Sequence, residues 1–467
     1  MPRERYKKLK EYLSVENPVL LDVIDRYRTL DEIAYSVGLL DKTKTYTEHI
    51  SWWPMISILG TFSAGKSTFI NEYLGTEIQE SGNQAIDDKF TVVCYGDNTE
   101  TITLPGLALD ADPRFPFYNI SEEVNKVDPG EGNRVNMYLQ LKSLKSEKIK
   151  GKILIDSPGF DADSQRDAIL KITSHIVEMS DLVLVFFDAR HPEPGAMRDT
   201  LEHLVSTTIR HRDANKVLYV LNQIDTTAKE DNLEDVIGSW QRALSKEGLV
   251  SGNFYGIYSE KAASHIADES LAERLKGKRD SDLAKILDRM DKVGIERAYR
   301  IVKALDDFAK EIKEKKIPLL KEVLERWRSR VVMTDMAVWG IFAILAIAAQ
   351  WKLGIFSDLS GHMVWIGGGG AAMFLTWLGI HIKASHFFAK RLARKYEESD
   401  RTIARAIIQN TTFFRSLFGF GKRWHHHTIE QIDRLIATSK ESIQKLNDQY
   451  VSPSGSMDTE STIGQNA

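Results

Sequence analysis

The sequence predicts an α/β domain with a mostly parallel sheet, joined to an α-helical bundle that contains a hydrophobic hairpin. Three observations support this architecture. A glycine-rich loop separates an apolar strand from a helix at residues 55–74, and apolar strands alternate with helical segments as far as residue 258. Two long uncharged segments follow at residues 336–351 and 363–382. With 467 residues, the chain should form two or three domains.

The composition indicates an intracellular protein. A formal net charge of -4 and a pI near 6.3 argue against a nucleic-acid partner, which usually requires a basic surface. The single cysteine, Cys94, excludes an internal disulfide framework and fits a reducing compartment. The first residues mix charges of both signs without an apolar run behind them, so we expect no cleavable signal peptide.

The loop after the first strand has the spacing Gly-x-x-x-x-Gly-Lys-Ser of a triphosphate-binding loop, or P-loop. Backbone N–H groups of such a loop surround the phosphates, Lys66 adds a positive charge, and the Ser67 hydroxyl is a candidate Mg²⁺ ligand. A glycine-rich turn without a ligand is the alternative, which the flanking strand and helix disfavour. The candidate nucleotide-binding residues here are Gly60, Ser63, Ala64, Gly65, Lys66, Ser67 and Thr68.

A second loop, Asp156-Ser-Pro-Gly159, follows the apolar strand at residues 151–155. A carboxylate at a strand end can hold Mg²⁺ through water, so Asp156 is the second candidate metal residue. The N–H of Gly159 is placed to meet a γ-phosphate. By itself, Asp-x-x-Gly is a common turn sequence. Its position directly after an apolar strand favours a role in binding Mg²⁺ and phosphate.

A third loop, Asn222-Gln223-Ile224-Asp225, follows the strand at residues 216–221, where nucleotide-binding sheets read the base. Asp225 can accept two hydrogen bonds from guanine, and Asn222 can tie the loop back to the P-loop. Asp225 thus favours GTP, whereas Gln223, which replaces the lysine expected between these two residues, leaves ATP open. Ser259, after a last strand at residues 254–258, is a candidate for a backbone contact to the base, and a purely structural role is equally consistent.

Further strands are expected in the same sheet at residues 90–95, 135–141 and 182–187, which makes this domain larger than a minimal one.

The two uncharged segments have the composition of membrane spans. Residues 363–382 would reach about 30 Å as a helix, the thickness of the hydrocarbon core, whereas residues 336–351 need extension at one end. The four glycines at 367–370 would be costly in a water-soluble helix but suit close contacts between membrane helices. The alternative is a buried hairpin in a soluble bundle. Basic residues lie outside both segments, which places both termini in the cytosol: Arg326, Arg328, Arg330, Lys383, Lys390, Arg391, Arg394 and Lys395.

Amphipathic helices are expected on both sides of the hairpin, at residues 20–37, 295–327 with a bend at Pro318, 384–408 and 428–446. Helices from both ends of the chain could form one bundle, although residues 1–50 could instead pack on the α/β domain. The predicted organisation is N-terminal helices at 1–50, the nucleotide-binding domain at 51–268, a helical stalk at 269–330, the hairpin at 331–383, C-terminal helices at 384–451 and a disordered tail at 452–467.

The three loops together with a helical region interrupted by an apolar hairpin resemble the dynamin superfamily, especially bacterial dynamin-like proteins and mitofusins. The stretches Ile86-Asp-Asp88-Lys-Phe90 and 181–189 also resemble the Eps15-homology-domain ATPases. This resemblance implies Mg²⁺-dependent GTP hydrolysis, with ATP not excluded, and homo-oligomers on a lipid bilayer formed through the G domains and the helical bundle. It also implies that Ser63 contacts the phosphates or a monovalent cation.

One position departs from the family pattern. The switch I threonine, which normally coordinates Mg²⁺ and orients water, falls on Asp87. A carboxylate there could ligate Mg²⁺ but would repel the γ-phosphate, so hydrolysis could be slow. The candidate catalytic residues are Ser63, Lys66, Asp87 and Gly159.

The leading hypothesis is a membrane-anchored GTPase with two spans that assembles to tether, fuse or remodel bilayers. A first alternative is a membrane-bound nucleotide switch, or slow NTPase, that recruits partners without mechanical work, and Asp87 favours it. A second alternative is a soluble nucleotide-binding scaffold, in which the apolar hairpin is buried in the hydrophobic core.

Overall fold

The computed structural model describes residues 2–79, 89–115, 135–159, 166–192, 216–246, 252–263, 265–353, 363–419 and 422–450. The chain divides into two compact units. One comprises Lys7–Pro18 and Glu48–Ile301, and the other comprises Met1–Tyr6, Val19–Thr47 and Val302–Ala467. The first unit holds the sheet, and the described part of the second is helical.

The sheet has the strand order β3-β4-β2-β5-β1-β6-β7-β8. Strands β5, β1, β6, β7 and β8 are mutually parallel, whereas β2 runs antiparallel to β5 and β3 antiparallel to β4. The predicted α/β class is therefore confirmed. The strands are β1 (Met55–Gly60), β2 (Phe90–Tyr95), β3 (Ile102–Pro105), β4 (Leu139–Leu144), β5 (Ile153–Asp156), β6 (Leu182–Asp188), β7 (Val217–Asn222) and β8 (Asn253–Gly256).

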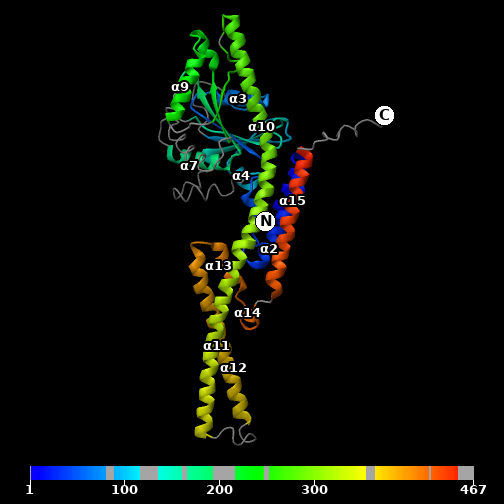
Figure 1. Cartoon of the computed structure of the whole chain (residues 1–467), viewed down its shortest axis with the longest axis vertical. Helices are drawn as coiled ribbons and strands as arrows, with labels where there is room; N and C mark the ends of the chain where they lie inside the picture. The colour runs from blue at the N-terminus through cyan, green and yellow to red at the C-terminus, as the bar shows by residue number, and fades with distance from the viewer. Residues whose placement is uncertain are drawn as a thin grey trace, which may run out of the picture. The chain divides into compact units, whose positions relative to one another are not determined.

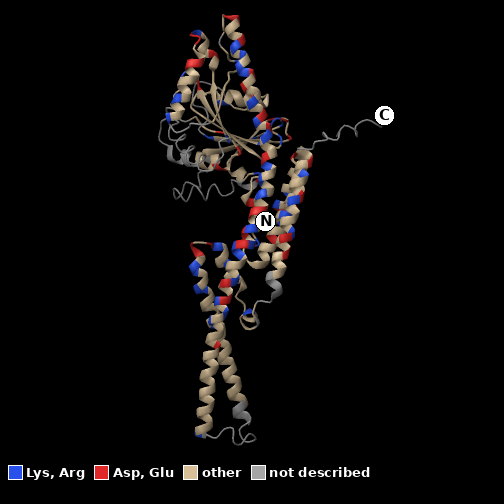
Figure 2. Ribbon diagram, viewed as in Figure 1, with Lys and Arg blue, Asp and Glu red and all other residues tan. Residues whose placement is uncertain are grey.

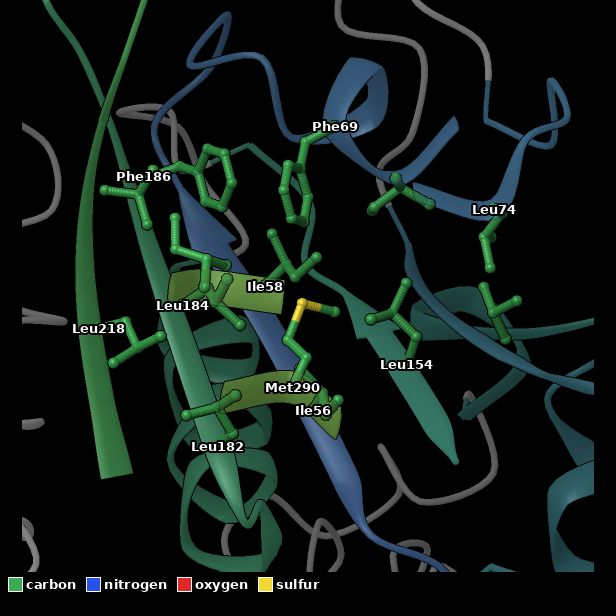
Figure 3. Close-up of a cluster of buried hydrophobic side chains, with 14 of the residues drawn as sticks. Ile56, Ile58, Phe69, Leu74, Leu154, Leu182, Leu184, Phe186, Leu218 and Met290 are labelled. Atoms are coloured by element: carbon green, nitrogen blue, oxygen red, sulfur yellow. The ribbon is translucent and has the colours of Figure 1, made fainter. Parts of the chain in front are cut away.

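Helices cover both faces of the sheet, which explains why its central strands are continuous apolar runs. On one face, α3 (Lys66–Leu74) and α10 (Glu269–Glu311) supply Phe69 and Met290 to a core around β1 and β6 (Figure 3). On the other face, α7 (Arg166–Met179) and α9 (Leu233–Lys246) pack on the strands, with Trp240 edge-on against Phe187. All residues of β1 are buried, so the P-loop starts from a rigid strand.

Two contacts fix the amino-terminal end of β1. Asp181 accepts hydrogen bonds from the backbone N–H of Met55 (3.0 Å) and from Arg300 of α10 (2.7 Å). Glu16, at the end of α1 (Pro2–Glu16), accepts from Trp53 Nε1 (2.8 Å) and from the N–H of Gly151 (3.0 Å). Burial raises the pKa of Glu16, and these two donors oppose that shift.

Two local predictions were wrong in detail. Residues 135–138 form the short helix α6 (Val135–Tyr138), and β4 starts only at Leu139. Just before Pro318 the helix contains a π-helical turn, Ile312–Lys316, whose extra residue accommodates a proline that lacks an N–H. The helix expected at 384–408 is interrupted at Asp400, whose carboxylate caps the next helix by accepting from the N–H of Thr402 (3.0 Å).

The helical unit contains α2 (Leu21–Val37), α11 (Ile317–Leu353), α12 (Met363–Glu397), α13 (Arg401–Asn410), α14 (Phe413–Phe418) and α15 (Lys422–Tyr450). Helices from opposite ends of the chain, α2 and α15, lie side by side (Figure 1) and form an ion pair between Asp22 and Lys445. Asn410 of α13 donates to the carbonyl of Val37, 2.8 Å away, which ties α13 to α2.

Helices α11 and α12 also lie side by side (Figure 1), with the rings of Trp339 and Trp377 6.0 Å apart. Residues 336–351 of α11 and 367–382 of α12 carry no charged side chain (Figure 2). The continuous helix Glu269–Lys352 contains one stretch long and apolar enough to cross a membrane, judged by length and composition. Among the described residues, nothing would lie within 4 Å of a Cβ at any of the glycines 367–370, so a close helix contact there stays a prediction.

A buried polar cluster joins α11, α12 and α14 where the uncharged stretch begins. His381 Nδ1 lies 2.8 Å from an Asp335 oxygen, and His381 Nε2 lies 2.8 Å from the Ser416 hydroxyl. Trp377 Nε1 donates to the same carboxylate over 3.1 Å. The side chain of His381 is fully buried, so these hydrogen bonds satisfy polar atoms that water does not reach.

Candidate nucleotide-binding site

The P-loop connects β1 to α3, and its two glycines are required by the packing around it. A Cβ on Gly60 would lie 2.7 Å from the carbonyl oxygen of Phe186 on the neighbouring strand. Gly65 has φ +82°, and its Cβ would lie 2.2 Å from Asn222 Nδ2. Ser63 is also left-handed, with φ 58°. The loop therefore has a tight curl that a side chain at either glycine would prevent.

Lys66 is the first residue of α3 and is buried inside this curl. Its ammonium donates to the carbonyl oxygens of Gly60 (3.0 Å) and Thr61 (3.1 Å). Burial lowers the pKa of Lys66, and the negative charge of Asp156 opposes that shift. A phosphate in the loop would favour the charged form further, because an adjacent anion stabilises an ammonium.

Asp156 ends β5 and pairs in register with Ile58 of β1, so it reaches the same carboxyl edge of the sheet as the P-loop. Asp156 and the Ser67 hydroxyl supply hard oxygen ligands, which Mg²⁺ prefers, so these residues fit the metal. Gly159 packs on the P-loop, since a Cβ there would lie 3.1 Å from Phe62 Cα.

The loop after β7 is tied to the P-loop by two side chains. Asn222 Nδ2 donates to the carbonyl of Ala64 over 2.9 Å, the link that the sequence suggested. Gln223 has φ 63° and donates through Nε2 to the carbonyl of Ser63 over 2.6 Å. The glutamine thus contacts the P-loop itself, which was not predicted. Asp225 follows in the 3-10 helix Ile224–Lys229, with its side chain buried.

Ser259 lies beyond β8, and its hydroxyl donates to a carboxylate oxygen of Glu72 on α3. The contact ties the segment after β8 to the helix that follows the P-loop. Arg190 sits after β6, where it pairs with Asp188 over 2.6 Å. The hydrogen bonds that Arg190 donates to the Asp188 carboxylate raise the pKa of Arg190, and the negative charge of Asp225 acts in the same direction.

A buried glutamine that the sequence did not single out contacts the candidate metal carboxylate. Gln79 Nε2 donates to Asp156 Oδ2 over 2.6 Å, and Gln79 Oε1 accepts from Lys142 Nζ over 2.6 Å. A single glutamine after a helix carries no motif. In the sequence, Gln140 and Lys142 alternate with apolar residues along β4, and this alternation is the feature that could have indicated polar contacts in this part of the sheet.

The comparisons with known proteins agree with this geometry. Residues 56–224, from β1 to the base-reading loop, match the family model described as the dynamin family. Residues 56–224 therefore form a dynamin-family domain. Members of that family are nucleoside-triphosphate hydrolases, and the GTP-binding character of the domain fits the three loops.

The dynamin-family domain is similar to curated proteins over part of their length. EH domain-containing protein 2 of Homo sapiens is 28% identical over 203 residues, covering 41% of this chain and 34% of that protein. EH domain-containing protein 1 of Arabidopsis thaliana is 25% identical over 274 residues, covering 56% of this chain and 46% of that protein. The chain therefore spans less than half the length of these two relatives.

A solved structure of an oligomerised bacterial dynamin pair, reported to sense and tether membranes over long range, also aligns. It covers 91% of this chain and 78% of its own chain at 16% identity, with a TM-score of 0.36. The similarity to the dynamin family is carried by residues 56–224.

Most of the predicted site residues therefore lie on the loops at one edge of the sheet. Asp87, the candidate switch residue, lies outside the described residues, as does the predicted tail at 452–467. Direct contact with a nucleotide remains a prediction for Gly60, Ser63, Ala64, Gly65, Lys66, Ser67, Thr68, Asn222, Gln223, Asp225 and Ser259.

Proposed function

We propose that the protein is a membrane-anchored, dynamin-like GTPase whose Mg²⁺-dependent nucleotide cycle drives self-assembly and the tethering, fusion or remodelling of bilayers. The observation that carries this proposal is the convergence of the P-loop, the Asp156 loop and the Asn222 loop at one sheet edge. The same chain has a long helix whose apolar side chains are exposed.

Each residue has a proposed role. Lys66 neutralises the outer phosphates, and the N–H of Gly159 donates to the γ-phosphate. Ser67 and Asp156 would hold Mg²⁺, which supplies positive charge to the phosphates when bound. Asp225 reads the guanine edge. Asn222 and Gln223 hold the P-loop against the base-reading loop, which keeps the two ends of the site in register.

GTP is the proposed substrate, and ATP is the alternative because Gln223 replaces the expected lysine. A second candidate function, a membrane-bound switch with slow hydrolysis, is favoured by Asp87 at the switch threonine position. Turnover of GTP and of ATP by the purified full chain distinguishes these cases. Tight nucleotide binding with turnover that does not respond to protein density would support the switch.

We propose a lipid bilayer as the partner of α11 and α12, with two spans and both termini in the cytosol. Exposed apolar side chains along α11 support this proposal, including Ile347, which is 70% exposed, and Trp351, which is 91% exposed. In water such a surface would be an aggregation hazard, whereas in lipid it lowers the free energy of the inserted helix.

Membrane integration has a direct test. After alkaline carbonate treatment, the expressed full chain is expected to stay in the membrane pellet. Replacing Ile344, near the middle of the first predicted span, with lysine adds about 3 kcal/mol to the insertion free energy. The Ile344→Lys variant should therefore move partly to the supernatant.

The matched control for this test is Val15→Lys on α1. Val15 is 63% exposed and Ile344 is 67% exposed, so both lysines are equally tolerable in water. We expect Val15→Lys to stay in the pellet. Complete release of the unmodified chain by carbonate would contradict the bilayer proposal and support a soluble scaffold.

A further inference from the structure

A row of polar side chains, formed by Lys142, Gln79 and Asp156, lies beside the P-loop at the end of an apolar face of the sheet. On the α3 face, Leu144, Val93 and Leu154 belong to the hydrophobic core. Two residues along, the same face carries Lys142 on β4 and Asp156 on β5. A period of two along each strand puts these residues on one face, so the change from apolar to polar coincides with the edge that carries the P-loop.

Gln79 bridges the two charged residues of this row. Its side-chain amide lies between Lys142 Nζ and Asp156 Oδ2, at 2.6 Å from each. The ammonium can only donate and the carboxylate can only accept, so the amide orientation is fixed: Oε1 faces Lys142 and Nε2 faces Asp156. Gln79 is 3% exposed and Asp156 4% exposed, and hydrogen bonds in such a buried setting are strong.

Gln79 is itself held in place from α3. Asn71 Oδ1 accepts the backbone N–H of Ile78 and of Gln79, each over 3.0 Å. Asn71 Nδ2 donates to the carbonyl of Gln79 over 2.8 Å. Lys142 adds a bond to the carbonyl of Ile78 over 2.8 Å. The backbone that presents the glutamine is thus attached to the helix that begins with Lys66 and Ser67.

The neutral amide of Gln79 keeps the ammonium of Lys142 apart from the carboxylate of Asp156. If Lys142 contacted Asp156 directly, its charge would compensate the carboxylate and compete with a cation. Through Gln79, the carboxylate is hydrogen-bonded and fixed in rotation while it keeps its negative charge for a metal. Partners of this kind orient metal ligands, and their loss typically lowers metal affinity about 10- to 100-fold.

We propose that Gln79 is a positioning residue for Asp156, and that the Lys142–Gln79–Asp156 chain sets how strongly Mg²⁺ supports nucleotide binding. This inference rests on the proposed function, because it requires the P-loop to bind a Mg²⁺–nucleotide complex. It assigns a role to a residue outside the three recognised loops, and it links the segment after α3 to the metal carboxylate.

The test compares nucleotide affinity with and without the metal. The Kd of a fluorescent, non-hydrolysable GTP analogue is measured for the full chain in Mg²⁺ and in EDTA. The Mg²⁺ effect is the ratio of the Kd in EDTA to the Kd in Mg²⁺. We expect Gln79→Met, which keeps the side-chain length, to lower this ratio about tenfold or more. Its affinity in EDTA should stay within about twofold of the unchanged protein, since the phosphate contacts of the P-loop are retained.

Two further variants sharpen this test. Lys142→Met removes the ammonium that binds Gln79 and leaves the bond between Gln79 and Asp156 in place. It should lower the Mg²⁺ effect by a smaller factor than Gln79→Met does. Gln140→Met makes the same substitution on β4, where the amide donates to Thr91 over 2.8 Å, and should leave the Mg²⁺ effect unchanged. A Gln79→Met protein with an unchanged Mg²⁺ effect, or with equal losses in Mg²⁺ and EDTA, would overturn the inference. If the unchanged chain binds no nucleotide, the proposed function itself fails.

Discussion

Lys66→Ala is expected to lower kcat/KM for GTP hydrolysis by about 10³-fold. The ammonium is held inside the P-loop by the carbonyl oxygens of Gly60 and Thr61, so its position is fixed before the phosphates arrive. A preorganised charge is most effective where charge develops in the transition state. The measurement is phosphate release from GTP by the full chain in liposomes.

The matched control is Lys292→Ala on α10. Its side chain is 61% exposed and pairs with Asp288 one helical turn away, so its loss should leave turnover unchanged. Equal activity of Lys66→Ala and Lys292→Ala would mean that the P-loop does not carry the hydrolysis.

Asp335→Ala is expected to lower the free energy of unfolding of the helical unit by about 3 kcal/mol. The substitution leaves His381 buried without its carboxylate partner and removes the acceptor of the Trp377 indole N–H. Loss of one member of a buried polar pair costs more than the pair itself contributes, because the remaining group stays dehydrated. Thermal unfolding in detergent, followed by circular dichroism, measures the change.

A double-mutant cycle isolates the interaction between the two residues. Because Asp335→Leu with His381→Leu removes both polar groups, the double variant should lose less stability than the sum of the two single variants. On α15, Arg434→Ala breaks an exposed ion pair with Glu430 and should change stability by no more than about 0.5 kcal/mol. Strict additivity of the Asp335 and His381 effects would show that the two side chains do not interact.

The parts predicted correctly from the sequence depend on local spacing. Gly60, Gly65 and Lys66 are set by a motif eight residues long, and β1, β6 and β7 are continuous apolar runs because both faces of the sheet are covered. The Asn222 link to the P-loop could be suggested because both ends of it belong to recognised loops.

The parts that escaped prediction depend on contacts between distant residues. Gln79 is 77 positions from Asp156, and neither the glutamine nor its neighbours form a pattern. Gln223 was recognised as a substitution, but its bond to Ser63 depends on two left-handed residues facing each other. The glycines at 367–370 suggested a helix contact, yet no described residue would lie within 4 Å of a Cβ at these positions.

We propose that this dynamin-family domain hydrolyses GTP in an assembly on a membrane. It is tested most directly by the GTP hydrolysis rate per molecule at increasing densities of the full chain in liposomes, with Lys66→Ala as the background. If neighbouring domains complete each other's sites, as proposed, the rate per molecule is expected to rise with density. A rate per molecule that stays constant across all densities, or that equals the Lys66→Ala background, would contradict it.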